Sequence, residues 1–219
     1  MKVAIIYRGE YFRTGEKATS FFDVVDNHQR NFHARFENVD LFFETRNTST
    51  EHDSKLKYCL TFKKYNFNND NKTCIDSIIN SLKIHDFSEY DFVISTRFDL
   101  YFNDLFSRFR IDFNKYNFLW REPPNLDNGM PRVCDHMIGF PGFRYNQFFK
   151  IDLEDDYVIK PNARWGFLPQ PDQQSHHINQ FLHIDLSDIN FMLDGMTLKS
   201  GHEYEEPEIA KRIVLLRHK

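Results

Sequence analysis

The sequence predicts an α/β fold in which helices cover both faces of a mostly parallel sheet. Three short apolar runs, at residues 3–7, 39–43 and 92–96, stop abruptly in polar residues, as strands buried on both faces do. Segments with helical spacing separate these runs, so the strands need the crossover connections of a parallel sheet. The 219 residues are 41% hydrophobic and 16% aromatic, which is enough apolar material for a packed core. We therefore expect one domain over residues 1–219.

Helices are expected between the apolar runs because apolar positions there step by three or four. One helix is predicted between the first two runs, and two more between the second and third. Thr73 and Asp76 form a capping box at the start of the last one. The positions that carry this spacing are Phe21, Val25, His28, Phe32 and Phe36, then Leu56, Cys59 and Leu60, then Ile75, Ile78, Ile79 and Leu82.

The second half of the chain is less regular. Residues 117–124 and 136–143 are predicted strands, and proline and glycine bracket a long irregular region around them. A helix is expected at about 173–183, a strand and turn at 189–195, and a short helix from Pro207.

The composition argues against several classes of function. A net charge of −4 with both signs interspersed gives no basic field for nucleic acid. The apolar run at residues 3–7 is too short for a signal peptide or a membrane span, so we expect a cytoplasmic protein. Cys59, Cys74 and Cys134 have no C-x-x-C spacing, which favours reduced thiols over a disulfide framework or a cysteine zinc site.

The candidate site lies where the strands end, because ligands of open α/β sheets bind beyond the carboxyl ends of the parallel strands. The three runs deliver residues 8–13, 44–46 and 97–104 to that edge. Guanidinium forks suit phosphate oxygens, and Gly9 permits close approach of the backbone to a ligand. No P-loop or G-x-G-x-x-G motif is present. The candidate phosphate- and nucleotide-binding residues are Arg8, Gly9, Arg13, Thr45, Arg46 and Arg97.

A carboxylate stands beside the last of these arginines. Strand alternation puts Ser95, Arg97, Asp99, Tyr101 and Asn103 on one face. Asp99 can hold a divalent cation that bridges a diphosphate, or it can form a solvated ion pair with Arg97. Tyr101 can stack on a nucleobase or sugar, or pack in the core.

Further polar candidates follow in the second half. Asp135 can accept a proton from an incoming hydroxyl, or cap a turn through its own backbone. His136 lies beside it. The histidines from His176 onwards lack H-E-x-x-H spacing. His176 can add a single nitrogen to a metal held by Asp99, or be a partly buried helix residue.

The ordered set "AIIYRGEYFR", "VDLFFETR", "YDFVISTRFDLYF" and "DHMIGFPG" resembles small glycosyltransferase-like proteins of bacterial polysaccharide loci and large algal DNA viruses. These resemble the GT-A nucleotide-sugar transferases. The resemblance covers about residues 1–150, with a looser match through "PDQQSHHINQFL".

The resemblance implies a Rossmann-like GT-A fold, an α/β/α sandwich with a nucleotide-binding half (1–104) and an irregular acceptor-side half (105–219). It implies a nucleotide-diphosphate sugar donor, with UDP the expected nucleotide, and Mn²⁺ or Mg²⁺ held by a D-x-D motif. Arg8, Gly9 and Arg13 match the nucleotide-binding first loop, and Asp99 matches the metal position. Arg97 replaces the first aspartate, giving R-x-D.

The function implied is transfer of a sugar to a glycan or glycoprotein hydroxyl, in the host cytoplasm if the chain is viral. Asp135 is the candidate base and Asp99 the candidate residue at the leaving diphosphate. The alternatives are a nucleotide-sugar hydrolase or nucleotidyltransferase on the same fold, and a non-catalytic carbohydrate-binding protein.

Overall fold

The computed structural model describes thirteen stretches of the chain. They are residues 1–8, 18–33, 35–45, 57, 60–67, 74–98, 100–103, 106–119, 121–122, 132–134, 136–150, 184–193 and 213–215, with single-residue gaps at 34, 99, 120 and 135. The first half contains β1 (Lys2–Arg8), α1 (Ala18–His28), the π-helical turn η1 (Gln29–His33), β2 (Asn38–Thr45), β3 (Lys64–Phe67), α3 (Cys74–Leu82), β4 (Phe92–Arg97) and β5 (Leu100–Phe102). The second contains the 3₁₀ turn η2 (Phe106–Arg108), β6 (Tyr116–Phe118), β7 (Arg121–Glu122), β8 (Arg132–Val133), β9 (Met137–Pro141), the 3₁₀ helix η3 (Gly142–Lys150), the 3₁₀ turn η5 (Leu186–Asp188), β10 (Ile189–Phe191) and β11 (Ile213–Leu215).

The central sheet has seven strands in the order β10-β6-β9-β4-β1-β2-β3. The pairs β1–β2, β1–β4, β2–β3 and β6–β10 are parallel, and β9 runs antiparallel to both of its neighbours. The predicted α/β class with a mostly parallel sheet is confirmed. Strand order reverses between β1 and β4, which makes this pair the topological switch point of the sheet.

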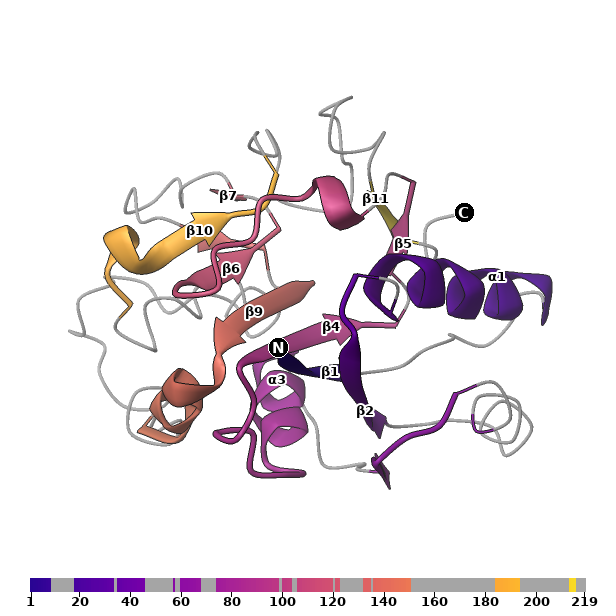
Figure 1. The fold of residues 1–219 in the computed structure, drawn as a ribbon, viewed down its shortest axis with the longest axis horizontal. Coiled ribbons are helices and arrows are strands. Elements are labelled where there is room, and N and C mark those ends of the chain that lie inside the picture. The colour runs from indigo at the N-terminus through magenta and orange to yellow at the C-terminus, as the bar shows by residue number, and fades with distance from the viewer. Residues whose placement is uncertain are drawn as a thin grey trace, which may run out of the picture.

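Two apolar cores lie on opposite faces of the sheet, because successive side chains of a buried strand alternate. Figure 1 shows α1 and α3 on either side of β1 and β4. Val3, Ile5 and Tyr7 of β1 join the core under α1, whereas Ala4 and Ile6 join the core under α3. The predicted layered arrangement is therefore present.

The three predicted N-terminal strands are confirmed with slightly wider bounds, and α1 with η1 and α3 match two predicted helices. Strand β3 was not predicted. It is a sheet edge with an exposed Lys64 and half-buried Tyr65 and Asn66, so it carries no apolar run. Lys57 is helical, as predicted for this segment, and the buried Leu60 lies outside the helix.

The second half also departs in detail from the prediction. The segment 117–124 divides between β6 and β7, and the strand predicted to 143 ends at Pro141 where η3 begins. The strand predicted at 189–195 ends at Phe191. Thr73 and the helices predicted at 173–183 and from Pro207 lie outside the described residues.

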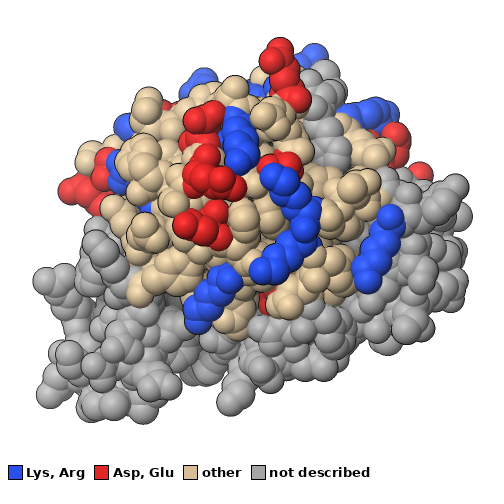
Figure 2. All heavy atoms as spheres, turned by 60° about the horizontal axis from the view of Figure 1, so that its bottom comes forward, with Lys and Arg blue, Asp and Glu red and all other residues tan. Residues whose placement is uncertain are grey.

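The surface carries no single dominant charge on the face shown in Figure 2. Acidic and basic side chains lie next to one another there. Within the described part of the chain, no helix is both long and apolar enough to cross a membrane.

Asp40 of β2 makes stability depend on acid pH. Burial alone raises the pKa of its carboxyl, but hydrogen bonds from Lys63 (2.6 Å) and Tyr90 (2.8 Å) and the charges of Lys63 and Lys2 outweigh burial and hold it below its usual value. A depressed pKa stabilises the fold above the unfolded-state pKa, and this stability is lost as pH falls through the folded-state pKa.

We therefore expect the free energy of unfolding to fall between about pH 5 and pH 2, with Asp40 contributing about 1 kcal/mol of the loss. Urea denaturation of wild type and Asp40→Asn at several pH values measures this contribution. The variant should be less stable at pH 7 and lose less on acidification. Parallel acid profiles for the two proteins would contradict the assignment.

Candidate functional site

A row of polar residues crosses the carboxyl end of the sheet. Arg8 pairs in register with Glu44 of β2 on one side and with Arg97 of β4 on the other. Asn66 of β3 pairs with Glu44, and the backbone N–H of Arg97 donates to the carbonyl of His136, 3.0 Å away. We call Asn66, Glu44, Arg8, Arg97 and His136 the polar row. Neighbouring strands lie about 4.8 Å apart, so each member sits directly beside the next.

The polar row is a consequence of strand periodicity. Arg8, Glu44 and Arg97 occupy the last or next-to-last position of their strands, immediately beyond buried apolar residues. They share the α3 face, since Ile6, Phe42 and Val93, two or four residues earlier on the three strands, lie in the core under α3. The row therefore lies at the switch point, where the crevice of this sheet type forms.

The two arginines differ in environment. Arg8 is only 3% exposed, and its Nε donates to Ser95 Oγ at 3.2 Å. Ser95 Oγ lies 3.5 Å from Ser81 Oγ of α3, which donates to the Ile78 carbonyl at 2.7 Å. Arg97 is half-buried. Arg97 is thus the more exposed of the two arginines, while Arg8 is buried on the neighbouring strand and bonded to Ser95.

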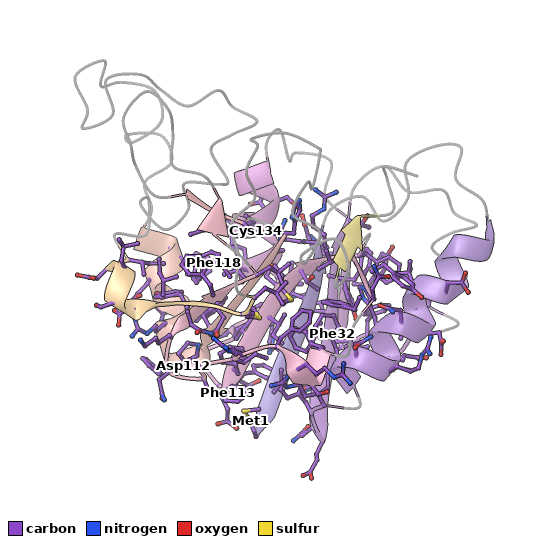
Figure 3. All side chains as sticks on the ribbon, turned by 90° about the horizontal axis from the view of Figure 1, so that it is seen from above. Met1, Phe32, Asp112, Phe113, Phe118 and Cys134 are labelled. Carbon is purple, nitrogen blue, oxygen red and sulfur yellow. The ribbon has the colours of Figure 1, made fainter. Side chains whose placement is uncertain are left out.

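His136, the last member of the polar row, directly precedes β9. It is 5% exposed, and its Nδ1 lies 3.2 Å from Sγ of the buried Cys134. Figure 3 shows Cys134 at the end of the sheet opposite Met1, which is the carboxyl end of β1. The contact with Cys134 holds the imidazole, while the backbone carbonyl of His136 accepts from the Arg97 N–H. Cys134 carries a free thiol, as the sequence predicted for it.

Of the predicted site residues, Arg8, Arg97 and His136 come together in the polar row. Thr45 follows Glu44 and, by alternation, lies on the opposite face, fully buried. Gly9, Arg13, Arg46, Asp99, Asp135 and His176 lie outside the described residues.

The predicted alternation from Ser95 to Asn103 is wrong beyond Arg97. Strand β4 ends there, and Leu100–Phe102 forms β5, which pairs antiparallel with β11 in a separate two-stranded sheet. Tyr101 is half-buried and packs against the core under α1. Phe98, the first residue after β4, is fully buried in the core under α1.

Sequence reasoning missed Glu44, Ser81 and the role of Ser95. Glu44 is fully buried, and it stands in register with Arg8 on the next strand. The sequence did contain a signal for Glu44, because each of the three strands places a charged residue directly after its apolar run.

A divalent cation, which the resemblance implies, finds no ligand set in the described residues. No group of three His, Cys, Asp or Glu side chains within them is placed to hold a metal ion. The position of the first D-x-D carboxylate carries the guanidinium of Arg97 instead. Asp99 lies outside the described residues, so its role as a metal ligand stays a prediction.

The fold has relatives among solved structures. The galactosyltransferase LgtC, crystallised with donor and acceptor sugar analogs, superposes with a TM-score of 0.51 at 11% identity, covering 87% of this chain and 73% of LgtC. The described part of the chain has a GT-A-like fold. The GT-A-like architecture expected from the sequence is thereby confirmed. No family model and no curated protein sequence matches this chain.

Two larger glycosyltransferases also share similarity at the level of structure. GlyE of Streptococcus pneumoniae TIGR4 matches 88% of this chain with a TM-score of 0.45 at 10% identity. The bifunctional glycosyltransferase WbbM matches 87% with a TM-score of 0.46 at 10% identity. This chain spans 45% of the GlyE chain and 38% of the WbbM chain.

Proposed function

We propose that this chain is an enzyme that transfers a sugar from a nucleotide-diphosphate donor to a hydroxyl of a glycan or glycoprotein. The observation that carries the proposal is the pairing of Arg8 with Arg97 across the switch point of a GT-A-like sheet. Like charges directly opposite each other on paired strands are destabilising unless something offsets them. Glu44 stands in register with Arg8 on its other side, and two guanidinium groups at neighbouring strand ends suit the oxygens of a bound diphosphate.

In the proposed mechanism the polar row stabilises the leaving diphosphate. Negative charge develops on the diphosphate as the bond to the sugar breaks, and donors already aimed at that charge lower the barrier. Arg97, being half-buried, makes the direct contact. Arg8 acts from behind, because a buried charge is poorly screened and the bond to Ser95 fixes its orientation.

Two carboxylates complete the proposal. Asp135 takes the proton of the acceptor hydroxyl as general base, and it neighbours His136 of the polar row in sequence. Asp99 follows Arg97 by two residues and contributes to the diphosphate end of the site, alone or as a ligand of Mn²⁺ or Mg²⁺. LgtC, with its donor and acceptor sugar analogs, supports this reaction class through the shared fold.

Thermal unfolding with UDP, GDP, dTDP and their sugar conjugates tests the proposal. A nucleotide at 100 times its dissociation constant adds about 2.7 kcal/mol to the folded state, or roughly 5–10 °C in Tm for a chain of this size. At least one nucleotide should give such a shift. The absence of any shift across the panel would refute nucleotide-sugar chemistry of every kind, transferase or hydrolase.

Asp99→Ala is expected to abolish the part of the nucleotide shift that Mn²⁺ adds and EDTA removes, while the unliganded Tm stays within about 2 °C of wild type. Titrating Mn²⁺ against the nucleotide in both proteins measures this. Asp26→Ala is the matched control, since Asp26 is an exposed carboxylate of α1 paired with Arg30. If Asp99→Ala keeps the full cation-dependent shift, Asp99 has no role at the diphosphate.

Product analysis separates transfer from hydrolysis. A transferase should consume the nucleotide sugar rapidly only when a hydroxyl acceptor is present, whereas a hydrolase consumes it in water alone. Release of free sugar at the same rate with and without a glycan acceptor would favour the hydrolase.

A further inference from the structure

The segment that follows Asp99 is held by side chains of α1 and η1. Asn27 forms both hydrogen bonds that a neighbouring strand would form with Phe102: its Nδ2 donates to the Phe102 carbonyl at 2.8 Å, and its Oδ1 accepts from the Phe102 N–H at 2.9 Å. His28 Nε2 bonds the Leu100 carbonyl. One helical turn later, Asn31 Oδ1 accepts from the Phe106 N–H at 2.7 Å. Three successive polar contacts thus follow the backbone of one segment.

These contacts take the place of a missing strand. Strand β5 pairs with β11 along one edge, and Figure 1 shows β11 and α1 next to β5. The N–H and carbonyl of Phe102 are taken by Asn27, so they are not available to β11. An uncovered strand edge exposes unpaired backbone groups, and a carboxamide that donates and accepts satisfies them. We call Asn27, His28 and Asn31 the amide clamp.

The clamp is buried and rigid. Asn27 and Asn31 are 4% and 6% exposed, and His28 is fully buried. Asn31 Nδ2 donates to the Asn27 carbonyl at 2.9 Å, which fixes the two amides relative to each other. The His28 ring stacks on Tyr7, at 5.3 Å between centroids, and contacts Phe98 at 5.4 Å. Phe32, which points from η1 toward the sheet in Figure 3, packs edge-on against Phe102.

The buried amides of the clamp add little net stability, so their role is expected to lie in the segment that they hold. Moving a carboxamide out of water costs free energy. The hydrogen bonds it forms in the protein largely offset this cost but add little net stability. Apolar residues at positions 27 and 31 would extend the existing core under α1. Apolar residues could not hold the backbone groups of Leu100, Phe102 and Phe106 in fixed positions.

We propose that the amide clamp positions Asp99 for the diphosphate, and this inference rests on the function proposed above. Arg97 is fixed by β4 and by its bond to His136. Phe98 is buried in the core under α1, and Leu100 is held by His28. The described residues on either side of Asp99 are therefore held in place, Arg97 by the sheet and Leu100 by the clamp. Asn27 is a positioning residue, since it acts through Asp99.

Asn27→Ala tests the clamp, with Asn117→Ala as the matched control. Asn117 is also a fully buried amide that bonds backbone groups, donating to the carbonyls of Asp112 (2.8 Å) and Lys115 (2.7 Å) and accepting from the Asp112 N–H (2.9 Å). It lies on β6, two strands from β4. Both variants should lower Tm. Only Asn27→Ala should also weaken UDP, GDP or dTDP binding, by tenfold or more, because small displacements of a positioned group cost about that much or more.

A double-mutant cycle with Asp99→Ala separates positioning from general destabilisation. If Asn27 acts through Asp99, removing Asn27 from the Asp99→Ala background should change nucleotide affinity by less than about twofold. Hydrogen exchange at Leu100–Phe102 should accelerate in Asn27→Ala and not in Asn117→Ala. Should Asn27→Ala fail to fold, Asn31→Ala, which removes the contact with Phe106, is compared with Asn117→Ala in the same way.

The outcomes distinguish the clamp from the function. If the wild-type chain binds none of the three nucleotides, the proposed function fails and the clamp inference fails with it. If wild type binds a nucleotide and Asn27→Ala or Asn31→Ala binds it equally well, the clamp inference alone is overturned. Equal losses of affinity in the Asn27 and Asn117 variants, or additive losses with Asp99→Ala, overturn it as well.

Discussion

Replacing Arg97 with alanine is expected to weaken UDP binding by about 10- to 100-fold, the equivalent of one or two charge-assisted hydrogen bonds. The unliganded protein should lose little stability, since Arg97 is only half-buried. Arg97→Lys should recover part of the affinity, because lysine restores the charge but not the planar fork that matches phosphate oxygens. Isothermal titration with UDP across the three proteins measures this order.

Arg8→Ala, unlike Arg97→Ala, should destabilise the fold as well as weaken UDP binding. Arg8 is buried and bonded to Ser95, so its removal leaves Ser95 and Glu44 without the charge between their strands. A loss of about 2–4 kcal/mol in unfolding free energy should accompany the loss of affinity. Arg30→Ala is the matched control, because Arg30 is an exposed guanidinium paired with Asp26. Unchanged UDP affinity in Arg97→Ala would remove the polar row from the donor site.

The sequence predicts the buried strands well, since burial on both faces leaves continuous apolar runs that end at charged residues. The direction of a strand within the sheet is not predicted by its apolar run. The run at Met137–Pro141 is as apolar as β1 or β4, yet it pairs antiparallel to β4. Nothing in a run buried on both faces records direction, which depends on the path of the connecting segments. The edge strand β3 escaped prediction because Lys64 is exposed and Tyr65 and Asn66 are only half-buried.

The sheet edge at which the site residues meet was predictable, but not which of them are neighbours along it. Arg8 and Arg97 stand out as charges at strand ends, yet 89 residues separate them, and only the order β4-β1-β2 makes them neighbours. Asn27 carries no local signal, because asparagine in an amphipathic helix is read as a solvent-facing residue. Its importance depends on the segment after β4 turning away from the sheet, and the sequence alone predicted a continuous strand there.

Gly142→Ala is expected to cause the largest loss of stability, at least about 3 kcal/mol or roughly 10 °C in Tm. A Cβ built at Gly142 would lie 1.9 Å from the Tyr90 carbonyl oxygen and 3.0 Å from that of Phe87. Both are backbone atoms next to β4, so neither can rotate away as a side chain could. The backbone of η3 would have to separate from the segment that leads into β4.

Gly139→Ala is the control for Gly142→Ala, since it adds the same methyl group three residues earlier. Its Cβ would lie 3.0 Å from two ring atoms of Phe92, and that ring can shift by a few tenths of an ångström, at a cost of about 1 kcal/mol. Thermal and urea unfolding of both variants give the comparison, and failure of Gly142→Ala alone to fold is the extreme form of the expected result. Equal stability of the two variants would contradict the close approach at Tyr90.

The close approach at Gly142 also bears on the site at the other end of the same strand pair. Phe92 pairs with Pro141 and Thr96 with Met137, so the register fixed beside Gly142 determines that His136 meets Arg97. A slip of one residue would turn every side chain of β9 to the opposite face. Any Gly142→Ala protein that does fold should therefore also bind UDP less tightly than Gly139→Ala, and titration of both at a temperature below their transitions measures the difference.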